Sequence, residues 1–412
     1  MKRFVKIYTY WLLGILLFTG CDDYLKEDSG DLLIPGKVEE FLPMLYREGF
    51  PRNFDDEVAW LYLMTDDVEM GQLELDPDDE NNDTRDKNSV DAFSVGEGEE
   101  PYKWERDIKS YADNFWERRY GNILACNLVI DALPEMVYVE ADSGSYNFLA
   151  AQAYAMRAYH YWCLVNSYAL PWSKENLDEP GVVIRTEPQI DIAARRRSSI
   201  REVYDLINED IENAEKYIKV ATFDGNIHRL SEPAILLLAS RIALFQENWD
   251  EVIRTGKLFL AQNSIILNLN DQDTTLFGTE KGLSNKIFTM MDGTINKEVV
   301  FTFGTSSYSP YQYLSTSGEL FGLGFRPSHN TDASLIRSYE EGDLRKKAYF
   351  LKDIPAKKAE SMWEEDRPYK YKYYYPIKYR QMSGSTSTKP SENLLHENWR
   401  SVEVMLNLAE AY

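Results

Sequence analysis

The sequence predicts a mainly α fold, namely a tetratricopeptide-like helical-repeat scaffold that carries long loops and short strands as insertions. Apolar residues at every third or fourth position predict helices in three segments, 104–132, 145–167 and 199–219. Residues 228–262 then predict two antiparallel helices joined by a short turn, with alanines where the helices would cross. One such pair cannot bury its apolar faces alone, so the preceding helices are its expected neighbours.

The bulk composition supports a large folded core and excludes one class of partner. Of the 412 residues, 44% are hydrophobic and 13% are aromatic, and tyrosine alone occurs 28 times. A chain of this composition is not disordered. The formal net charge of −23 repels phosphate backbones, so nucleic-acid binding through counterion release is not expected.

The first element is a predicted lipoprotein signal peptide over residues 1–20. It begins with basic residues and continues with an apolar run over 10–18 that is too short to anchor the chain across a bilayer. Small residues directly precede Cys21, as in a bacterial lipoprotein cleavage box, so Cys21 is the expected lipidation site. An ordinary signal peptide followed by an incidental cysteine is the alternative. The polar residues 21–36 form the predicted tether.

A short helix over 38–46 and a long polar loop over 71–101 are expected next. The acidic centre of the loop reads DPDDENNDTRD. No register places acids at alternate positions with glycine sixth and glutamate twelfth, as a calcium-binding EF-hand loop requires. A solvated loop is therefore expected, and an irregular site for an incidental calcium ion stays open. No other cofactor is expected.

The segment 152–172, QAYAMRAYHYWCLVNSYALPW, raises the question of whether His160 and Cys163 ligate a metal. Both residues lie on one apolar stripe, and two further apolar stripes cover the other sides of the same helix. Such a helix is buried between neighbours, so both residues are expected in the core; a metal pair would need third and fourth ligands. Arg157 is expected to meet an acidic partner or helix carbonyls. Cys126 lies in a similar apolar pattern and is expected to be a buried free thiol.

Local signals mark the ends of the next helices. Ser198 or Ser199 is the N-cap candidate of the third segment, and Glu202, three residues after Ser199, would complete a capping box. Ser231 is the N-cap candidate of the first helix of the pair, which is expected to end near Phe245. The second helix of the pair is expected over 249–260.

Beyond residue 264 the sequence becomes rich in Gly, Ser, Thr, Asn and Tyr. A short strand is expected at 299–303, and the alternating tyrosines and lysines of 369–379 predict an exposed strand or hairpin. Residues 401–412 predict another amphipathic helix, which stops without a cap. We therefore expect the chain to be a fragment that lacks its C-terminal part.

The sequence contains no recognisable catalytic motif. Its four histidines form no H-E-x-x-H pair, and phosphate-binding, dinucleotide-binding and nucleophile-elbow motifs are absent from it. Acidic pairs such as Asp66–Asp67 and Glu364–Glu365 could serve a glycosidase, but 68 acids make such pairs expected by chance. We therefore expect no catalytic residue, no metal site and no enzymatic activity.

Aromatic side chains in polar loop sequence favour a binding function. The aromatic residues that no helical stripe explains are Tyr308, Tyr311, Tyr313 and Trp363. Their rings can stack on the apolar faces of sugar rings, while charged side chains such as Asp66, Asp67 and Arg326 can satisfy the hydroxyls. Together these residues are the candidate ligand-binding set, and incidental loop packing is the alternative.

Several motifs resemble those of the SusD/RagB family of glycan-binding outer-membrane lipoproteins of Bacteroidetes. Segments similar to the family's motifs lie in the family's order at 61–70, 120–133, 152–172, 196–214, 338–350 and 402–412. Asp343 and Arg345 match the family's Y-x-x-x-D-x-R motif. The chain departs from the pattern at Ala169, where the family usually has Gly, and at Asn407, where it often has Arg.

The resemblance implies a lipid-anchored protein on the outer-membrane surface that binds oligosaccharides and delivers them to a SusC-type TonB-dependent transporter. Residues 37–220 would form the N-terminal helical region, and 221–412 an incomplete C-terminal region. A structural lid subunit with little ligand affinity is the alternative, and a binder of peptide or another nutrient, or a glycoside hydrolase, is less favoured. The family's ligand sites lie in variable loops, so no motif identifies the glycan or its contacts.

Overall fold

Helices dominate the structure, which is a computed structural model. The residues that it describes are 37–51, 64–70, 99–105, 112–136, 138–188, 195–272, 274–276, 296–303, 325–328, 334–352, 374–376 and 397–412. Within them the strands form three short two-stranded sheets, and the remaining regular elements are helical. The mainly α prediction is therefore confirmed, whereas the expected division near residue 220 stays a prediction.

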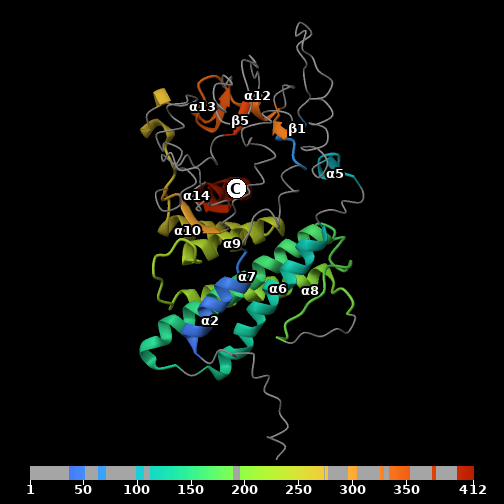
Figure 1. The fold of residues 1–412 in the computed structure, drawn as a ribbon, viewed down its shortest axis with the longest axis vertical. Coiled ribbons are helices and arrows are strands. Elements are labelled where there is room, and N and C mark those ends of the chain that lie inside the picture. Colours follow the sequence, from blue (N-terminus) through green and yellow to red (C-terminus); the bar gives the residue numbers. More distant parts are fainter. Residues whose placement is uncertain are drawn as a thin grey trace, which may run out of the picture.

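Two long helices, α6 (Ala112–Ala132) and α8 (Ile200–Ile218), both pack against a third, α7 (Ser143–Tyr168), in the lower half of Figure 1. Above them, α9 (Glu232–Phe245) and α10 (Trp249–Gln262) pack together across a short turn. These two helices have nearly the bounds that the sequence predicts. Because α9 also contacts α7 and α8, the pair buries its apolar face on the preceding helices, as a helical repeat requires.

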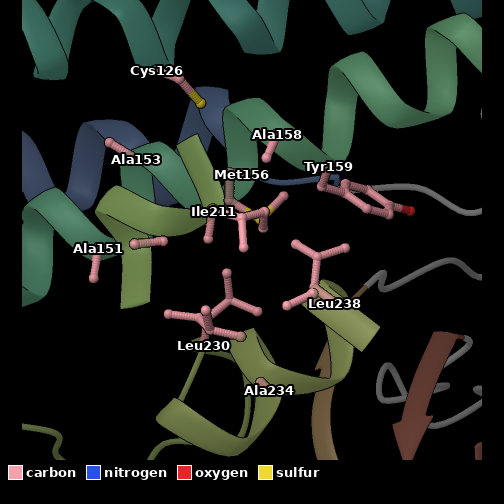
Figure 2. Packing of buried hydrophobic residues seen from close by; sticks show 14 of the residues in the cluster. Cys126, Ala151, Ala153, Met156, Ala158, Tyr159, Ile211, Leu230, Ala234 and Leu238 are labelled. Carbon is pink, nitrogen blue, oxygen red and sulfur yellow. The ribbon is translucent and has the colours of Figure 1, made fainter. Parts of the chain in front are cut away.

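Helix α7 is the most buried element of this layer. From Phe148 to Val165 almost every side chain is buried, and the alanines among them let neighbouring helices approach closely. Figure 2 shows this core, in which side chains such as Met156 of α7, Ile211 of α8 and Leu238 of α9 gather between the helices. His160 and Cys163 are only 0% and 8% exposed, so their expected place in the core is confirmed.

The buried charge of Arg157 is neutralised inside the same layer. Its Nε and Nη2 atoms donate to the two carboxylate oxygens of Asp210 at 2.8 and 2.7 Å. Its Nη1 atom donates to Asn127 at 2.9 Å, so one guanidinium joins α6, α7 and α8. The expected acidic partner of Arg157 is confirmed. A bidentate pair whose third guanidinium nitrogen is also hydrogen-bonded is an arrangement in which a buried charge is tolerated.

The imidazole of His160 ties α7 to the first described helical segment. Arg119 of α6 donates from Nη1 to Nδ1 of His160 at 2.9 Å, because an arginine can only donate. The other ring nitrogen, Nε2, therefore carries the hydrogen and donates to the carbonyl of Gly49 at 2.8 Å. Gly49 ends a π-helical turn, η2 (Leu45–Gly49), that continues the short helix α2 (Val38–Met44).

Capping side chains fix the helix ends as the sequence predicts. The Ser199 hydroxyl accepts a hydrogen bond from the backbone of Glu202, and the Glu202 carboxylate accepts one from the backbone of Ser199. Ser231 caps α9 by accepting from the backbone N–H of Ala234. The capping box and the N-cap of the helix pair are thus confirmed.

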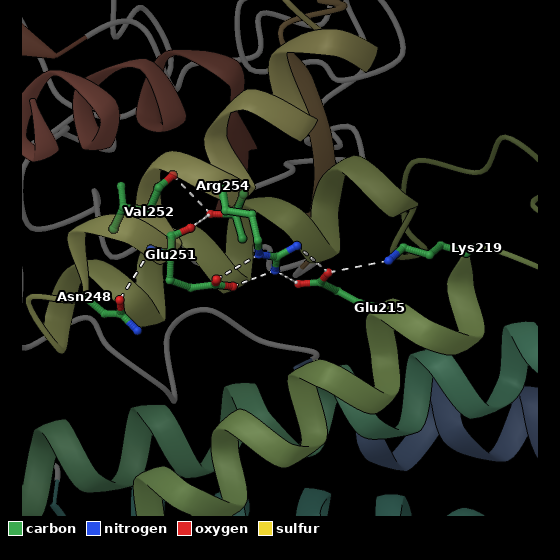
Figure 3. A network of polar contacts seen from close by, with 7 residues as sticks. Glu215, Lys219, Asn248, Glu251, Val252 and Arg254 are labelled. Atoms are coloured by element: carbon green, nitrogen blue, oxygen red, sulfur yellow. Dashed lines mark hydrogen bonds and ion pairs between the residues drawn. The ribbon is translucent and has the colours of Figure 1, made fainter.

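An ion-pair network fastens α10 to α8 (Figure 3). The guanidinium of Arg254 donates to both oxygens of Glu215 on α8 and to both oxygens of Glu251 on its own helix, at 2.6–3.1 Å. Glu215 is only 7% exposed and also lies 4.0 Å from Lys219. Because Glu215 is buried, this pairing is screened less than an exposed ion pair would be.

The last described helix, α14 (Ser401–Ala411), packs on both α9 and α10. Arg241 of α9 forms a bidentate ion pair with Glu403 at 2.6 and 2.7 Å, and Asn407 donates to the Ser240 hydroxyl at 3.1 Å. Gly256 allows the close approach of α10, since a Cβ at this position would lie 2.7 Å from Leu408. The departure at Asn407 is therefore accommodated by a buried polar contact.

The short strands join segments that lie far apart in the sequence. β2 (Val299–Phe303) pairs antiparallel with β6 (Glu397–Arg400), where Phe301 and Trp399 are fully buried with ring centroids 4.9 Å apart. β1 (Val68–Met70) pairs with β3 (Phe325–Pro327). β4 (Phe350–Lys352) pairs with β5 (Tyr374–Pro376), which is the described part of the predicted tyrosine–lysine strand.

The predicted start of the first long helix is wrong. A short helix, α5 (Glu99–Tyr102), ends just before Trp104, which has a φ of 54° and is 68% exposed. A bulky residue with positive φ cannot continue an α-helix. The described helix α6 begins only at Ala112. Trp104 therefore does not belong to a continuous first long helix, and residues 106–111 lie outside the described residues.

Candidate ligand-binding region

Short elements gather at the end of the molecule opposite α6–α8, above α9 and α10 in Figure 1. They are β1, β3, α12 (Leu335–Ser338), α13 (Leu344–Tyr349), β4 and β5. They are too short to form a core of their own, and two of the three strand pairs lie here. Such connecting segments, carried on a rigid scaffold, are where binding groups are usually found.

The pairing of β1 with β3 brings three of the predicted site residues together. Glu69 is the register partner of Arg326, and Asp66 and Asp67 form the exposed turn that leads into β1. The backbone N–H of Ser328, two residues after Arg326, donates to the carbonyl of Asp67 at 2.8 Å. Sequence spacing could not predict this juxtaposition, because the two segments lie more than 250 residues apart.

Ser328 anchors this strand pair to α12. Its hydroxyl donates to the carbonyl of Asp66 at 2.8 Å and accepts from the backbone N–H of Leu335 at 3.0 Å. Its own carbonyl accepts from the N–H of Ile336 at 3.0 Å. Ser328 is only 6% exposed, so these bonds form away from solvent. The acidic turn is therefore held in a fixed position relative to the helix that follows.

Tyr339 lies between the acidic turn and the Asp343–Arg345 pair of the D-x-R motif. The guanidinium carbon of Arg345 lies 5.3 Å from the centroid of the Tyr339 ring. Burial raises the pKa of Tyr339, and the carboxylates of Asp343 and Asp67 act in the same direction. Asp67 and Asp343 thus both lie within electrostatic range of one phenol. Sequence analysis missed Tyr339, although it is the tyrosine of the matched motif.

Asp343 and Arg345 form a close, partly exposed ion pair. Nη2 of Arg345 lies 2.6 Å from the Asp343 carboxylate, which also caps α13 by accepting from the backbone of Arg345 at 2.9 Å. The hydrogen bonds from Arg345 hold the pKa of Asp343 below its usual range. Both side chains therefore carry charge at neutral pH, and their charges compensate each other.

An open pocket of about 510 Å³ lies beside this pair. One wall is the backbone and side chains of 266–270, and the other is 342–345. Within this wall apolar and polar residues alternate from Leu267 to Asn270, with Asn268 and Asn270 exposed and Leu269 buried. The alternation in the sequence LNLN could have indicated this edge, but a pattern of four residues is too short to identify a site.

The remaining predicted site residues lie outside the described residues. They are Tyr308, Tyr311, Tyr313, Trp363, the acidic pair at Glu364–Glu365, the acidic loop at 76–86 and the lipidation residue Cys21. The aromatic part of the predicted site therefore stays a prediction. In the part that the structure does describe, no group of three or more His, Cys, Asp or Glu side chains could hold a metal ion.

One other sequence expectation can be compared with the structure. Cys126 and Cys163 are both free and buried, as expected for packing residues. Among the described helices, none has the length and apolar character needed to cross a membrane.

The comparisons with known proteins agree with one another. Residues 51–244 match a family of SusD-like proteins described as "Starch-binding associating with outer membrane". The SusD-like protein P38 of Formosa agariphila is 28% identical over 158 residues, a stretch that covers 38% of this chain and 27% of that protein. The match therefore spans only about a quarter of this relative's length.

Solved structures share the fold along most of the chain. A SusD superfamily protein from Bacteroides thetaiotaomicron has a TM-score of 0.63 and 16% identity, and the match covers 91% of this chain and 76% of that one. A SusD-like carbohydrate binding protein from Bacteroides vulgatus has a TM-score of 0.59 and 20% identity, and the match covers 92% and 71%. At these identities the likeness shows a common fold.

Proposed function

Because the chain belongs to the SusD/RagB family, we propose that it is a non-catalytic, lipid-anchored surface protein that binds glycans. It delivers them to a TonB-dependent outer-membrane transporter of the SusC type. The family description names starch binding and association with the outer membrane. One of the matched structures is that of a protein described as carbohydrate binding. Both descriptions support this assignment over a peptide-binding or hydrolytic role.

The observation that carries the proposal is the division between a buried helical base and a polar region above it. The buried charges of the base are paired with one another, as with Arg157 and Asp210, so these charges are unavailable for ligands. The region above it presents carboxylates, a guanidinium and amides beside a partly buried tyrosine. Sugars are recognised by this mixture of ring faces and fixed polar groups.

The binding part of the proposal predicts that one loop aromatic contributes directly. We expect isothermal titration of the mature chain against a polysaccharide panel to find a ligand whose affinity falls about tenfold or more in Tyr311→Ala, the loss of one stacked ring. Tyr138→Ala is the control, because Tyr138 is an exposed tyrosine that stacks on Tyr146 of α7, in the helical layer. Equal affinity of Tyr311→Ala and the wild type would remove Tyr311 from the site.

The delivery part is tested through the anchor and the partner. Cys21→Ala should move the protein from the membrane fraction to the soluble fraction and abolish labelling by a palmitate analogue, since acyl chains supply the membrane affinity. The wild type should copurify with a large TonB-dependent transporter from detergent-solubilised membranes. Copurification without binding to any glycan would instead favour the structural lid subunit. Unchanged membrane attachment of Cys21→Ala would exclude lipidation at that residue.

A further inference from the structure

The pocket between 266–270 and 342–345 has the dimensions and lining of a ligand subsite. Its volume of about 510 Å³ lies within the range of roughly 300–1,000 Å³ that is common for small-ligand pockets. Ile266, Leu267, Leu269 and Leu344 supply apolar surface. Asn268, Asn270, Asp343 and Arg345 supply donors and acceptors at the same rim.

The polar side chains of the rim are already oriented by bonds to one another. Nδ2 of Asn270 donates to Oδ1 of Asn268 at 3.0 Å, and the same oxygen accepts from the backbone N–H of Asn270 at 3.1 Å. Across the pocket, Nε and Nη2 of Arg345 are both directed to Asp343. Side chains that are fixed before the ligand arrives lose little conformational entropy on binding.

A buried carboxylate bonds to one wall and is linked through Arg400 to the helix that carries the other wall. Glu298 is only 3% exposed, and its Oε2 accepts from the backbone N–H of Leu267 in one wall at 3.0 Å. Its Oε1 lies 3.5 Å from Nη1 of Arg400, whose side chain hydrogen-bonds to Tyr349 at the end of α13. The first turn of α13 forms the opposite wall. These bonds connect the two segments that line the pocket.

The charges of the lining indicate which ligands fit. The nine lining residues contain one acid, Asp343, and one base, Arg345, and these already form a salt bridge at 2.6 Å. A carboxylate or sulfate entering the pocket would therefore compete with Asp343 for the only cation in the lining. The chain as a whole has a net charge of −23, which also repels polyanions.

We propose that this pocket is a subsite for neutral sugar residues and that the protein discriminates against uronate-rich and sulfated glycans. The inference rests on the proposed glycan-binding function and adds the ligand class and the residues of one subsite. Hydroxyl groups of the sugar bond to the amides of Asn268 and Asn270 and to the outer edge of the Asp343–Arg345 pair. The apolar side chains of the two walls contact the ring faces.

The test uses neutral and anionic probes on the full mature chain. Laminarin, soluble starch and glucomannan serve as neutral probes, and polygalacturonate and a sulfated galactan serve as anionic probes, each titrated by calorimetry. We expect at least one neutral probe to bind and both anionic probes to bind at least tenfold more weakly. Asn270→Ala should weaken the neutral probe about five- to tenfold, the effect of one lost hydrogen-bonding group.

Two further variants keep the test decisive. Asn213→Ala on α8 removes an amide of the same kind far from the pocket and should leave binding unchanged. Asn270→Lys, at an exposed position that tolerates a long side chain, should weaken the neutral probe and strengthen the anionic ones. Thermal unfolding of each variant confirms that it is folded.

The outcomes separate the inference from the function on which it rests. Binding of a neutral probe that Asn270→Ala and Asn270→Lys leave unchanged would overturn the subsite but leave glycan binding intact. Preference of the wild type for an anionic probe would overturn the ligand class. Failure of every probe and of a wider glycan array would overturn the proposed function and the subsite together.

Discussion

Single buried polar residues hold the helical layer in one arrangement. Arg157 joins three helices through Asp210 and Asn127, and it does so without access to water. Such a side chain stabilises the fold only while its partners are present, because removal of a charged partner leaves a buried charge unpaired. The sequence could indicate that Arg157 needs an acidic partner. It could not indicate Asp210, which lies 53 residues away on another helix.

Breaking this pair is expected to be costly. Arg157→Met should lower the free energy of unfolding by about 3–5 kcal/mol, because the carboxyl of Asp210 is left buried without its partner cation. Urea denaturation followed by far-UV circular dichroism measures the change. The double variant Arg157→Met with Asp210→Leu should recover most of the loss. A double variant as unstable as the single one would show that packing, and not the uncompensated charge, dominates.

His160 is expected to make stability depend on pH below neutrality. Burial lowers the pKa of His160 well below its usual range, and the charge of Arg119 acts in the same direction. In the unfolded chain a histidine titrates near about 6.5. Below that pH the unfolded state binds a proton that the folded state does not, so stability falls as pH falls. The slope approaches about 1.4 kcal/mol per pH unit for one proton.

The variant His160→Gln isolates this contribution. Glutamine can still donate to the carbonyl of Gly49 but does not titrate, so the difference in unfolding free energy between wild type and variant should change between pH 6.5 and 5. Above pH 7 the difference should be constant. Urea denaturation at a series of pH values measures it. Parallel profiles for the two proteins over the whole range would mean that His160 does not contribute.

At the scale of elements, the sequence predicted helices correctly where capping residues and apolar spacing indicate the same helix. Ser199 with Glu202 marks a helix start through bonds between neighbours in sequence, and α8 begins where they indicate. Trp104 shows the limit, since apolar spacing alone cannot reveal a residue that adopts positive φ. The strand pairs were beyond prediction because each joins distant segments, as Val68 joins Pro327.

Close packing of α10 on α14 yields a test with a matched control. Gly256→Val should destabilise the protein by about 1–3 kcal/mol through overpacking, because Leu408 occupies the space that a side chain would need. Gly121→Val, also inside a helix, meets nothing within 4 Å and should change stability by less than about 0.5 kcal/mol. Thermal unfolding compares the two. Equal effects would contradict the proposed close approach.

At the scale of the whole molecule, the fold separates a rigid base from a region that carries the candidate site. The sequence predicted the base well, because buried helices repeat the same apolar spacing over many residues. It predicted the polar members of the site only in part. Asp66, Asp67 and Arg326 are brought to one strand pair. Asn270 was missed because the opposite wall of its pocket comes from a distant segment, and Tyr339 was missed although Asp343 and Arg345 lie close to it in the sequence.

Because the buried helices and the candidate site lie in different parts of the fold, ligand affinity and stability should depend on different residues. Arg157 and His160 are enclosed by helices, so their substitution should change unfolding before it changes ligand affinity. Asn270 and Arg345 are exposed at the pocket rim and contribute little to the core. A protein that holds its ligand on such a surface needs only fixed polar groups and ring contacts, and no reacting side chain.

The central claim is that the chain binds a glycan and leaves it chemically unchanged. Equilibrium dialysis of the mature protein against a mixed oligosaccharide library, followed by mass spectrometry of the retained fraction, tests both parts at once. The account predicts saturable retention of an oligosaccharide that is recovered intact, with no new reducing ends after prolonged incubation. Retention of no oligosaccharide, or recovery of cleaved products, would contradict it.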